Sequence, residues 1–143
     1  MKIRNSTISD GQRVLEIWRD AVDATHDFLT QKDRMEIEEE VNAFLPNAPL
    51  VLAVNEFDRA LGFMLISDGH MDALFIDPVY RGRGVGRFLV NEALKNYPHL
   101  TTDVNEQNTQ AVGFYEHMGF QKTGRSEKDG QGRNYPLIHL KKI

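Results

Sequence analysis

Hydrophobic residues recur along this chain at two spacings, one typical of helices and the other of strands. In segments 14–22 and 85–94 they return every three or four residues, which predicts helices with one apolar face. Elsewhere they gather in short runs bounded by turn residues, which predicts strands. Ser9 and Gln12 have the spacing of a capping box before the first helix, and Thr30 is expected to cap the second.

These patterns predict an α+β fold in which strands and helices share a single mixed sheet. The expected strands lie at 1–5, 50–54, 61–67, 71–76, 100–104, 120–125 and 135–141, and the expected helices include 14–22, 31–45, 85–96 and 108–117. Pro46 and Pro49 end the second helix, and turns are expected at 56–59 and 129–132. Since the chain has no repeats or linkers, we expect one domain, residues 1–143.

A glycine-rich segment, Arg-Gly-Arg-Gly-Val-Gly at 81–86, lies between the expected strand 71–76 and the helix 85–96. Because glycine has no Cβ, successive backbone N–H groups can turn toward one anion at the positive end of the helix. Arginines at 81, 83 and 87 add positive charge. The segment therefore predicts a pyrophosphate-binding loop.

Other phosphate loops match this segment less well. A nucleoside triphosphate loop requires Lys followed by Ser or Thr after its last glycine, whereas Gly86 is followed here by Arg87 and Phe88. A dinucleotide loop has the spacing G-x-G-x-x-G, whereas this one has G-x-G-x-G. An ordinary glycine turn before a surface helix stays open as the alternative.

A second segment, VNEQNTQAVGFYEHMGF at 104–120, follows the expected strand 100–104. Together with the pattern Arg81-x-x-Gly84-x-Gly86 it resembles the GNAT superfamily of acetyl-CoA-dependent N-acetyltransferases, over nearly the whole chain. The resemblance implies the GNAT fold: a mixed, mostly antiparallel seven-stranded sheet with strands 4 and 5 splayed apart, and about four helices. It also implies direct transfer in a ternary complex from acetyl-CoA, without a metal, to a primary amine. That amine could be a lysine of a peptide or protein, an N-terminus or a small molecule.

The resemblance further implies which residues hold the cosubstrate. Its pyrophosphate is expected on the loop residues Arg81, Gly82, Arg83, Gly84, Val85, Gly86 and Arg87. The backbone of Leu74, Phe75 and Ile76 is expected to pair with the pantetheine amides, and Asn108, Ala111 and Tyr115 are expected to line the thioester. A backbone N–H of Phe75 or Ile76 would steady the oxyanion, and Tyr115 would protonate the leaving thiolate.

The spacing of Asn108 and Tyr115 is consistent with these roles. They are seven residues apart, which brings them to the same side of a helix two turns apart. Asn108 can also cap this helix. Three apolar residues are expected to pack this helix onto the sheet: Val112, Phe114 and Met118. The alternative for Tyr115 is a packing residue whose hydroxyl bonds a backbone carbonyl.

The general base is not fixed by the sequence. His26 is expected in the loop between the first two helices, with Asp23 and Asp27 near enough in sequence to attract a cation. Asp72, preceded by His70, occupies the place of a glutamate that many relatives carry on the fourth strand. Glu106 is a further candidate, with a solvated surface residue as its alternative. We name His26 and Asp72 as the catalytic candidates beside Tyr115.

Charge and composition narrow the range of partners. The net charge of −4 argues against nucleic-acid binding, and the absence of cysteine excludes disulfides, zinc–thiolate sites and an acetyl-cysteine intermediate. No apolar run is long enough for a membrane span and no signal peptide is present, so we expect a cytoplasmic protein, monomeric or homodimeric. The glutamates at 36, 38, 39 and 40 form either a solvated helix face or a surface attracting a basic acceptor. A non-catalytic acetyl-CoA sensor on the same fold is the alternative function.

Overall fold

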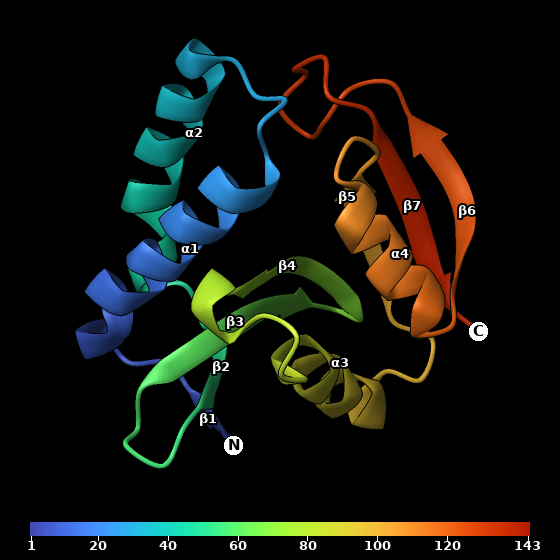
Figure 1. The fold of residues 1–143 in the computed structure, drawn as a ribbon. Helices are drawn as coiled ribbons and strands as arrows, with labels where there is room; N and C mark the ends of the chain where they lie inside the picture. The colour runs from blue at the N-terminus through green and yellow to red at the C-terminus, as the bar shows by residue number, and fades with distance from the viewer. The chain divides into compact units, whose positions relative to one another are not determined.

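The computed structural model describes residues 1–143 and contains the expected helices and strands (Figure 1). The helices are α1 (Gly11–Thr25), α2 (Gln31–Phe44), α3 (Val85–Asn96) and α4 (Thr109–His117). The strands are β1 (Lys2–Asn5), β2 (Val51–Val54), β3 (Ala60–Ser67), β4 (His70–Ile76), β5 (Thr101–Asn105), β6 (Phe120–Ser126) and β7 (Leu137–Lys142). Three short 3-10 helices are η1 (Ile8–Asp10), η2 (Leu45–Asn47) and η3 (Pro78–Tyr80).

The seven strands form one mixed sheet in the order β1-β2-β3-β4-β5-β7-β6. The pairs β1–β2, β2–β3, β5–β7 and β6–β7 are antiparallel, whereas β4 and β5 are parallel. The parallel register consists of His70 with Thr101 and Met71 with Thr102, at the beginning of both strands. The register of β4 with β5 thus covers the first two residues of β4.

The start of the first helix differs from the sequence-based prediction. The capping box consists of Thr7 and Asp10 rather than Ser9 and Gln12, and it encloses η1. The Thr7 amide donates to Asp10 Oδ2 at 2.8 Å, and Arg4 donates to both oxygens of the same carboxylate at 2.9 Å. An ionised carboxylate is a stronger hydrogen-bond acceptor than the neutral Gln12 amide, so the box closes earlier. The cap that Thr30 provides for α2 is confirmed, because its hydroxyl accepts from the Asp33 amide at 3.1 Å.

The chain divides into two compact units. The first unit comprises residues 1–65 and 73–90. Its core contains one face of α1, with Val14, Ile17 and Trp18, together with residues of β2 and β3 such as Leu52 and Phe63. The Arg34 guanidinium of α2 lies 4.8 Å from the centre of the Trp18 ring. Apolar burial and this cation–π contact therefore join both helices to the core of the unit.

The second unit comprises residues 66–72 and 91–143. Its buried side chains include Leu100 before β5, Val104 on β5 and Leu140 on β7, together with Tyr115 of α4 and Phe120 of β6. The rings of Tyr115 and Phe120 meet edge to face with centroids 5.4 Å apart. Helix α4 is thereby fixed to this strand group through its one fully buried side chain.

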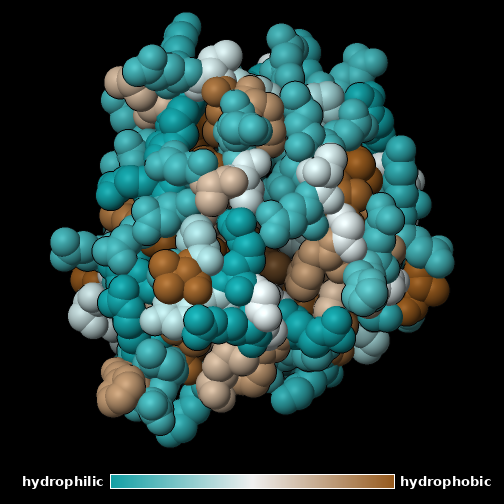
Figure 2. Space-filling view, viewed as in Figure 1, coloured by the Kyte–Doolittle hydropathy of each residue, from teal (hydrophilic) through white to brown (hydrophobic).

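The surface is mainly polar. On the face shown in Figure 2, hydrophilic residues predominate and hydrophobic residues form small separate groups. Scattered apolar residues of this kind are normal for a protein surface. One of the most exposed is Val79, 72% exposed, in η3 immediately before the glycine-rich loop. No helix is both long enough and apolar enough to cross a membrane.

Candidate functional site

The glycine-rich loop of the first unit leads from η3 into α3. Gly82 and Gly84 have φ angles of +77° and +81°, which residues with a side chain rarely adopt. A Cβ built on either glycine would have no protein atom within 4 Å, so both Cα atoms face open space. The carbonyl of Gly84 accepts the hydrogen bond of the Phe88 amide at 2.9 Å. The amides just before Phe88 are therefore at the helix start, where no intrahelical acceptor exists.

The arginines of this loop are exposed and available for an anion. The ion pairs of the structure do not include Arg81, Arg83 or Arg87. The guanidinium carbon of Arg83 lies 5.7 Å from the centre of the Tyr80 ring, which steadies the side chain without neutralising its charge. Open space beside two glycines, free amides at a helix start and unpaired arginines together fit a pyrophosphate.

A buried ion pair anchors the beginning of this loop. Asp77, 4% exposed, follows β4 directly, and one of its carboxylate oxygens accepts from the Val79 amide at 3.0 Å. The other accepts from Arg13 of α1 at 2.6 Å, and Arg13 also donates to the carbonyl of Ala60 at 3.0 and 2.8 Å. Burial acts to raise the pKa of Asp77, but hydrogen bonds from Arg13 and Val79 outweigh it and leave the pKa below its usual value.

Strand β4 reaches the loop with Leu74, Phe75 and Ile76 half-buried. Its close approach to β3 depends on Gly62, where a Cβ would come within 2.7 Å of Ile76 Cδ1 and 2.9 Å of the Phe75 carbonyl oxygen. The Phe75 ring packs on Phe63 with centroids 5.7 Å apart. The sequence analysis missed the roles of Gly62, which allows β3 and β4 to approach closely, and of the ion pair between Arg13 and Asp77, which anchors the loop. The Asp77-Pro78 dipeptide is the one local signal for this anchor, since Asp favours such turns.

His26 lies at the end of α1, as predicted, and its hydrogen bonds fix its tautomer. Thr25 Oγ1 lies 2.7 Å from the Ala21 carbonyl oxygen, to which it donates, and 2.7 Å from His26 Nδ1. The hydroxyl has one proton, so it accepts from His26, and Nδ1 carries the hydrogen of the neutral ring. Nε2 is then left with a free lone pair. Burial lowers the pKa of His26, although the charge of Asp27 acts in the opposite direction. The ring is therefore neutral at pH 7 and able to accept a proton.

The acidic side chains near α2 belong in part to ion pairs. Glu38 pairs with Arg19 at 2.9 Å and with Arg34 at 3.5 Å, which lowers its pKa. Asp23, expected to attract a cation beside His26, accepts from Arg34 at 2.9 Å. These ion pairs within the protein favour an acidic helix face without a role in binding over a surface that attracts a basic acceptor.

In the second unit, Asn108 and Tyr115 occupy α4 as the spacing predicts. Asn108 caps the helix, its side chain accepting from the Ala111 amide at 3.2 Å. Tyr115 is 6% exposed and lies near Thr102, whose hydroxyl donates to the Met71 carbonyl at 2.9 Å. Burial raises the pKa of Tyr115 well above its usual value, so the hydroxyl keeps its proton at neutral pH. Val112, Phe114 and Met118 are only half-buried, so their expected packing role is correct only in part.

The remaining base candidates differ in their partners. Asp72 accepts from the Ser67 hydroxyl at 2.7 Å and is exposed. His70 lies 4.0 Å from Asp72 and hydrogen-bonds Thr101 through Nδ1 at 2.7 Å. Glu106 receives two hydrogen bonds from Arg125, at 2.6 and 3.1 Å, which lower its pKa. A carboxylate held by a guanidinium is a poor proton acceptor, so the structure disfavours Glu106 as the base.

No group of three or more His, Asp or Glu side chains is arranged to hold a metal ion. Of the predicted site residues, the glycine-rich loop, Leu74–Ile76 and His26 belong to the first unit, and Asn108, Ala111, Tyr115 and Asp72 belong to the second.

Comparison with known proteins identifies the family of this chain. Residues 18–137 match the Acetyltransferase (GNAT) domain. The chain is 57% identical over 140 residues to the peptidyl-lysine N-acetyltransferase YjaB of Salmonella typhimurium and 58% identical over 140 residues to that of Escherichia coli K12. These alignments cover 98% of this chain and 97% and 95% of the relatives. The solution structure of apo-form YjaB from Escherichia coli superposes with a TM-score of 0.96 at 57% identity, covering 99% of this chain and 97% of that one. The coenzyme A complex of PaiA N-acetyltransferase from Thermoplasma acidophilum shares the fold, with a TM-score of 0.74 at 20% identity over 99% of both chains.

Proposed function

Because this chain belongs to the GNAT acetyltransferase family, and so transfers an acetyl group from acetyl-CoA to an amine, we propose that its acceptor is the ε-amino group of a peptide or protein lysine. The observation that carries the proposal is the similarity to two peptidyl-lysine N-acetyltransferases over 98% of the chain. Acceptor selectivity resides in many side chains, so identity of this extent supports it better than a shared fold does.

The donor is held through its phosphates and its pantetheine arm. We assign the pyrophosphate to the loop 81–87, where Gly82 and Gly84 leave open space and the arginines are unpaired. The backbone of Leu74–Ile76 is assigned to the pantetheine amides. The register of β4 with β5 ends at Met71, and backbone groups beyond it require other hydrogen-bond partners. Asn108 and Ala111 are assigned to the thioester end.

His26 is assigned as the general base. When a lysine nitrogen attacks the thioester carbonyl, its N–H bond becomes acidic and the proton must go to an acceptor. The neutral ring presents Nε2 for this purpose, because Thr25 holds the hydrogen on Nδ1. The pKa lowered by burial keeps this lone pair free at neutral pH. Asp72, half of whose carboxylate is engaged by Ser67, is the second candidate.

Tyr115 is assigned as the general acid for the thiolate. A proton donor must keep its proton until negative charge develops on the leaving sulfur, and burial provides this by raising the pKa of Tyr115. Since the chain has no cysteine, amine transfer has no thiol to form an acetyl-cysteine, and both substrates are bound together.

The test compares three acceptors with acetyl-CoA: a peptide with one lysine and a blocked N-terminus, the same peptide with arginine for lysine and a free N-terminus, and spermidine. Thiol release can be followed with a disulfide reagent, because a chain without cysteine gives no background. We expect turnover with the lysine peptide and acetyl-lysine in its mass spectrum. Preference for the free N-terminus or for spermidine would contradict the lysine proposal. Coenzyme A binding without turnover of any acceptor would indicate a sensor.

The proposal includes a cytoplasmic protein, monomeric or homodimeric, that binds neither nucleic acid nor membrane. The net charge of −4 supports the absence of nucleic-acid binding. Light scattering after size-exclusion chromatography, together with cell fractionation, tests the assembly state and the location.

A further inference from the structure

Three side chains from neighbouring strands of the second unit form a hydrogen-bonded chain that the proposed acetyl transfer does not use. Ser126 Oγ, at the end of β6, lies 2.7 Å from His139 Nε2 on β7. His139 Nδ1 lies 2.6 Å from Asp103 Oδ1 on β5. Serine, histidine and aspartate joined in this order have the arrangement that activates a serine hydroxyl in hydrolases.

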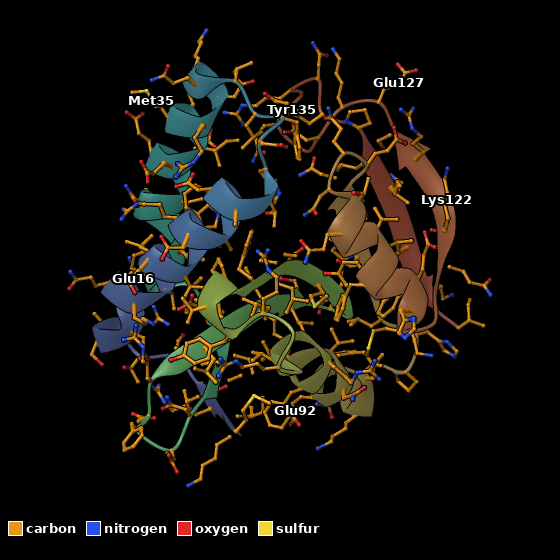
Figure 3. All side chains as sticks on the ribbon, viewed as in Figure 1. Glu16, Met35, Glu92, Lys122, Glu127 and Tyr135 are labelled. Carbon is orange, nitrogen blue, oxygen red and sulfur yellow. The ribbon has the colours of Figure 1, made fainter.

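The sheet register brings these residues together. His139 is paired with Asp103 across β5 and β7, and with Gly124 across β6 and β7 after a register shift. A Cβ on Gly124 would lie 3.4 Å from His139 Cδ2, at the distance of an ordinary van der Waals contact. The imidazole ring therefore lies beside Gly124 of β6, two residues before Ser126. Figure 3 labels Glu127 beside the end of β6, next to Ser126 in the sequence.

The hydrogen atoms shared by Ser126, His139 and Asp103 have one consistent arrangement. A carboxylate only accepts, so His139 Nδ1 carries the hydrogen that is shared with Asp103. In the neutral imidazole Nε2 is then unprotonated, and the Ser126 hydroxyl donates to it. The serine proton thus already points toward the group that would remove it.

Asp103 is held on its second oxygen as well. His70 Nε2 lies 3.3 Å from Asp103 Oδ2, and His70 Nδ1 lies 2.7 Å from the Thr101 hydroxyl. The 2.6 Å hydrogen bond with His139 fixes the orientation of this carboxylate. The side chains of Asp103 and His139 are each 35% exposed, so small solutes can reach these hydrogen-bonded side chains from solvent.

We propose that Ser126 is a nucleophile for activated acyl esters and thioesters, with His139 as its general base and Asp103 as the residue that orients His139. In the first step Ser126 Oγ forms a bond to the acyl carbon, its proton moves to His139 Nε2, and the bond to the leaving group breaks. The leaving group then takes the proton from His139. In the second step water attacks the acyl-serine and gives a proton to His139. Ser126 departs with that proton and a carboxylic acid is released.

The experiment uses p-nitrophenyl acetate with the full chain and no amine acceptor. We expect release of nitrophenolate with acetyl-Ser126 as the intermediate, identified by peptide mass spectrometry after rapid quenching in acid. Ser126→Ala should abolish this modified peptide. His139→Gln and Asp103→Asn should slow its formation by about 100-fold or more, a typical contribution of general-base catalysis.

The matched control is Thr123→Ala. Thr123 is also a hydroxyl residue of β6, but it donates to the backbone carbonyl of His139, at 3.3 Å, and not to the ring. The Thr123→Ala variant should therefore form acetyl-Ser126 at the wild-type rate. Ser126→Ala should retain acetylation of the lysine peptide, which shows that it folds and separates this activity from the proposed function. Acetyl groups on lysines only, or formation of acetyl-Ser126 in His139→Gln at the wild-type rate, would overturn the proposal.

Discussion

The clearest test of the pyrophosphate loop is Gly84→Ala, because the same substitution can be made in a matched loop that has no proposed ligand. Gly132, between β6 and β7, has a φ of +79° against +81° for Gly84, and a Cβ at either position would have no protein atom within 4 Å. The two substitutions therefore impose the same backbone strain and cause no clash with the protein.

The expected loss of stability is equal for the two variants. Placing alanine in the left-handed region costs about 1–2 kcal/mol, and the smaller entropy of the unfolded alanine chain returns about 0.4–1 kcal/mol. The net loss is about 1 kcal/mol, which for a chain of this size lowers the melting temperature by roughly 3 °C. Thermal unfolding followed by circular dichroism measures this for Gly84→Ala and Gly132→Ala.

The affinity for coenzyme A should separate the variants. The methyl group of Gly84→Ala projects into the space assigned to the pyrophosphate and displaces it from the backbone amides. Losing one hydrogen bond to a charged group costs about 1.5–3 kcal/mol, which corresponds to about 10- to 100-fold in Kd. Titration calorimetry with coenzyme A should show this loss for Gly84→Ala and wild-type affinity for Gly132→Ala. Equal affinity in both variants would refute the assignment of the loop.

Three further predictions concern proton transfer and the anchor of the loop. Tyr115→Phe should keep the fold and the affinity for acetyl-CoA but lower kcat by about 100-fold; wild-type kcat when chemistry is rate-limiting would make Tyr115 a packing residue. Burial lowers the pKa of His26 in the folded state, so below about pH 6.5 the unfolded chain binds more protons than the folded one. The free energy of unfolding therefore decreases as the pH is lowered from about 6.5 to the folded-state pKa. His26→Gln should remove this part of the pH dependence in urea unfolding; an unchanged profile would contradict it. Asp77→Ala should cost about 3 kcal/mol, because it leaves the half-buried Arg13 charge without its carboxylate; a loss below about 1 kcal/mol in the same assay would contradict this and indicate that Glu16, which also pairs with Arg13, is a sufficient partner.

The sequence determined the features whose cause lies within a few residues. The boundaries of α3, the cap of α2 by Thr30 and the cap of α4 by Asn108 follow from local backbone preferences and short-range hydrogen bonds. The glycine-rich loop was predictable for the same reason, since left-handed backbone at Gly82 and Gly84 is a property of those residues. The family followed from two such segments in order.

Only the tertiary structure decided which distant groups become partners. Arg13 and Asp77 are 64 residues apart, Asp103 and His139 are 36 apart, and their contacts depend on how elements pack and on strand register. Even the tautomer of His26 required the position of the Ala21 carbonyl one helical turn away. A side chain's neighbours across a sheet or between elements leave no local pattern, because the energy that selects them comes from burial and pairing after the chain has folded. The sequence therefore predicted the glycine-rich loop, the helix after it and His26 as a candidate base, whereas the tautomer of His26 and the contacts of Ser126 depend on the fold.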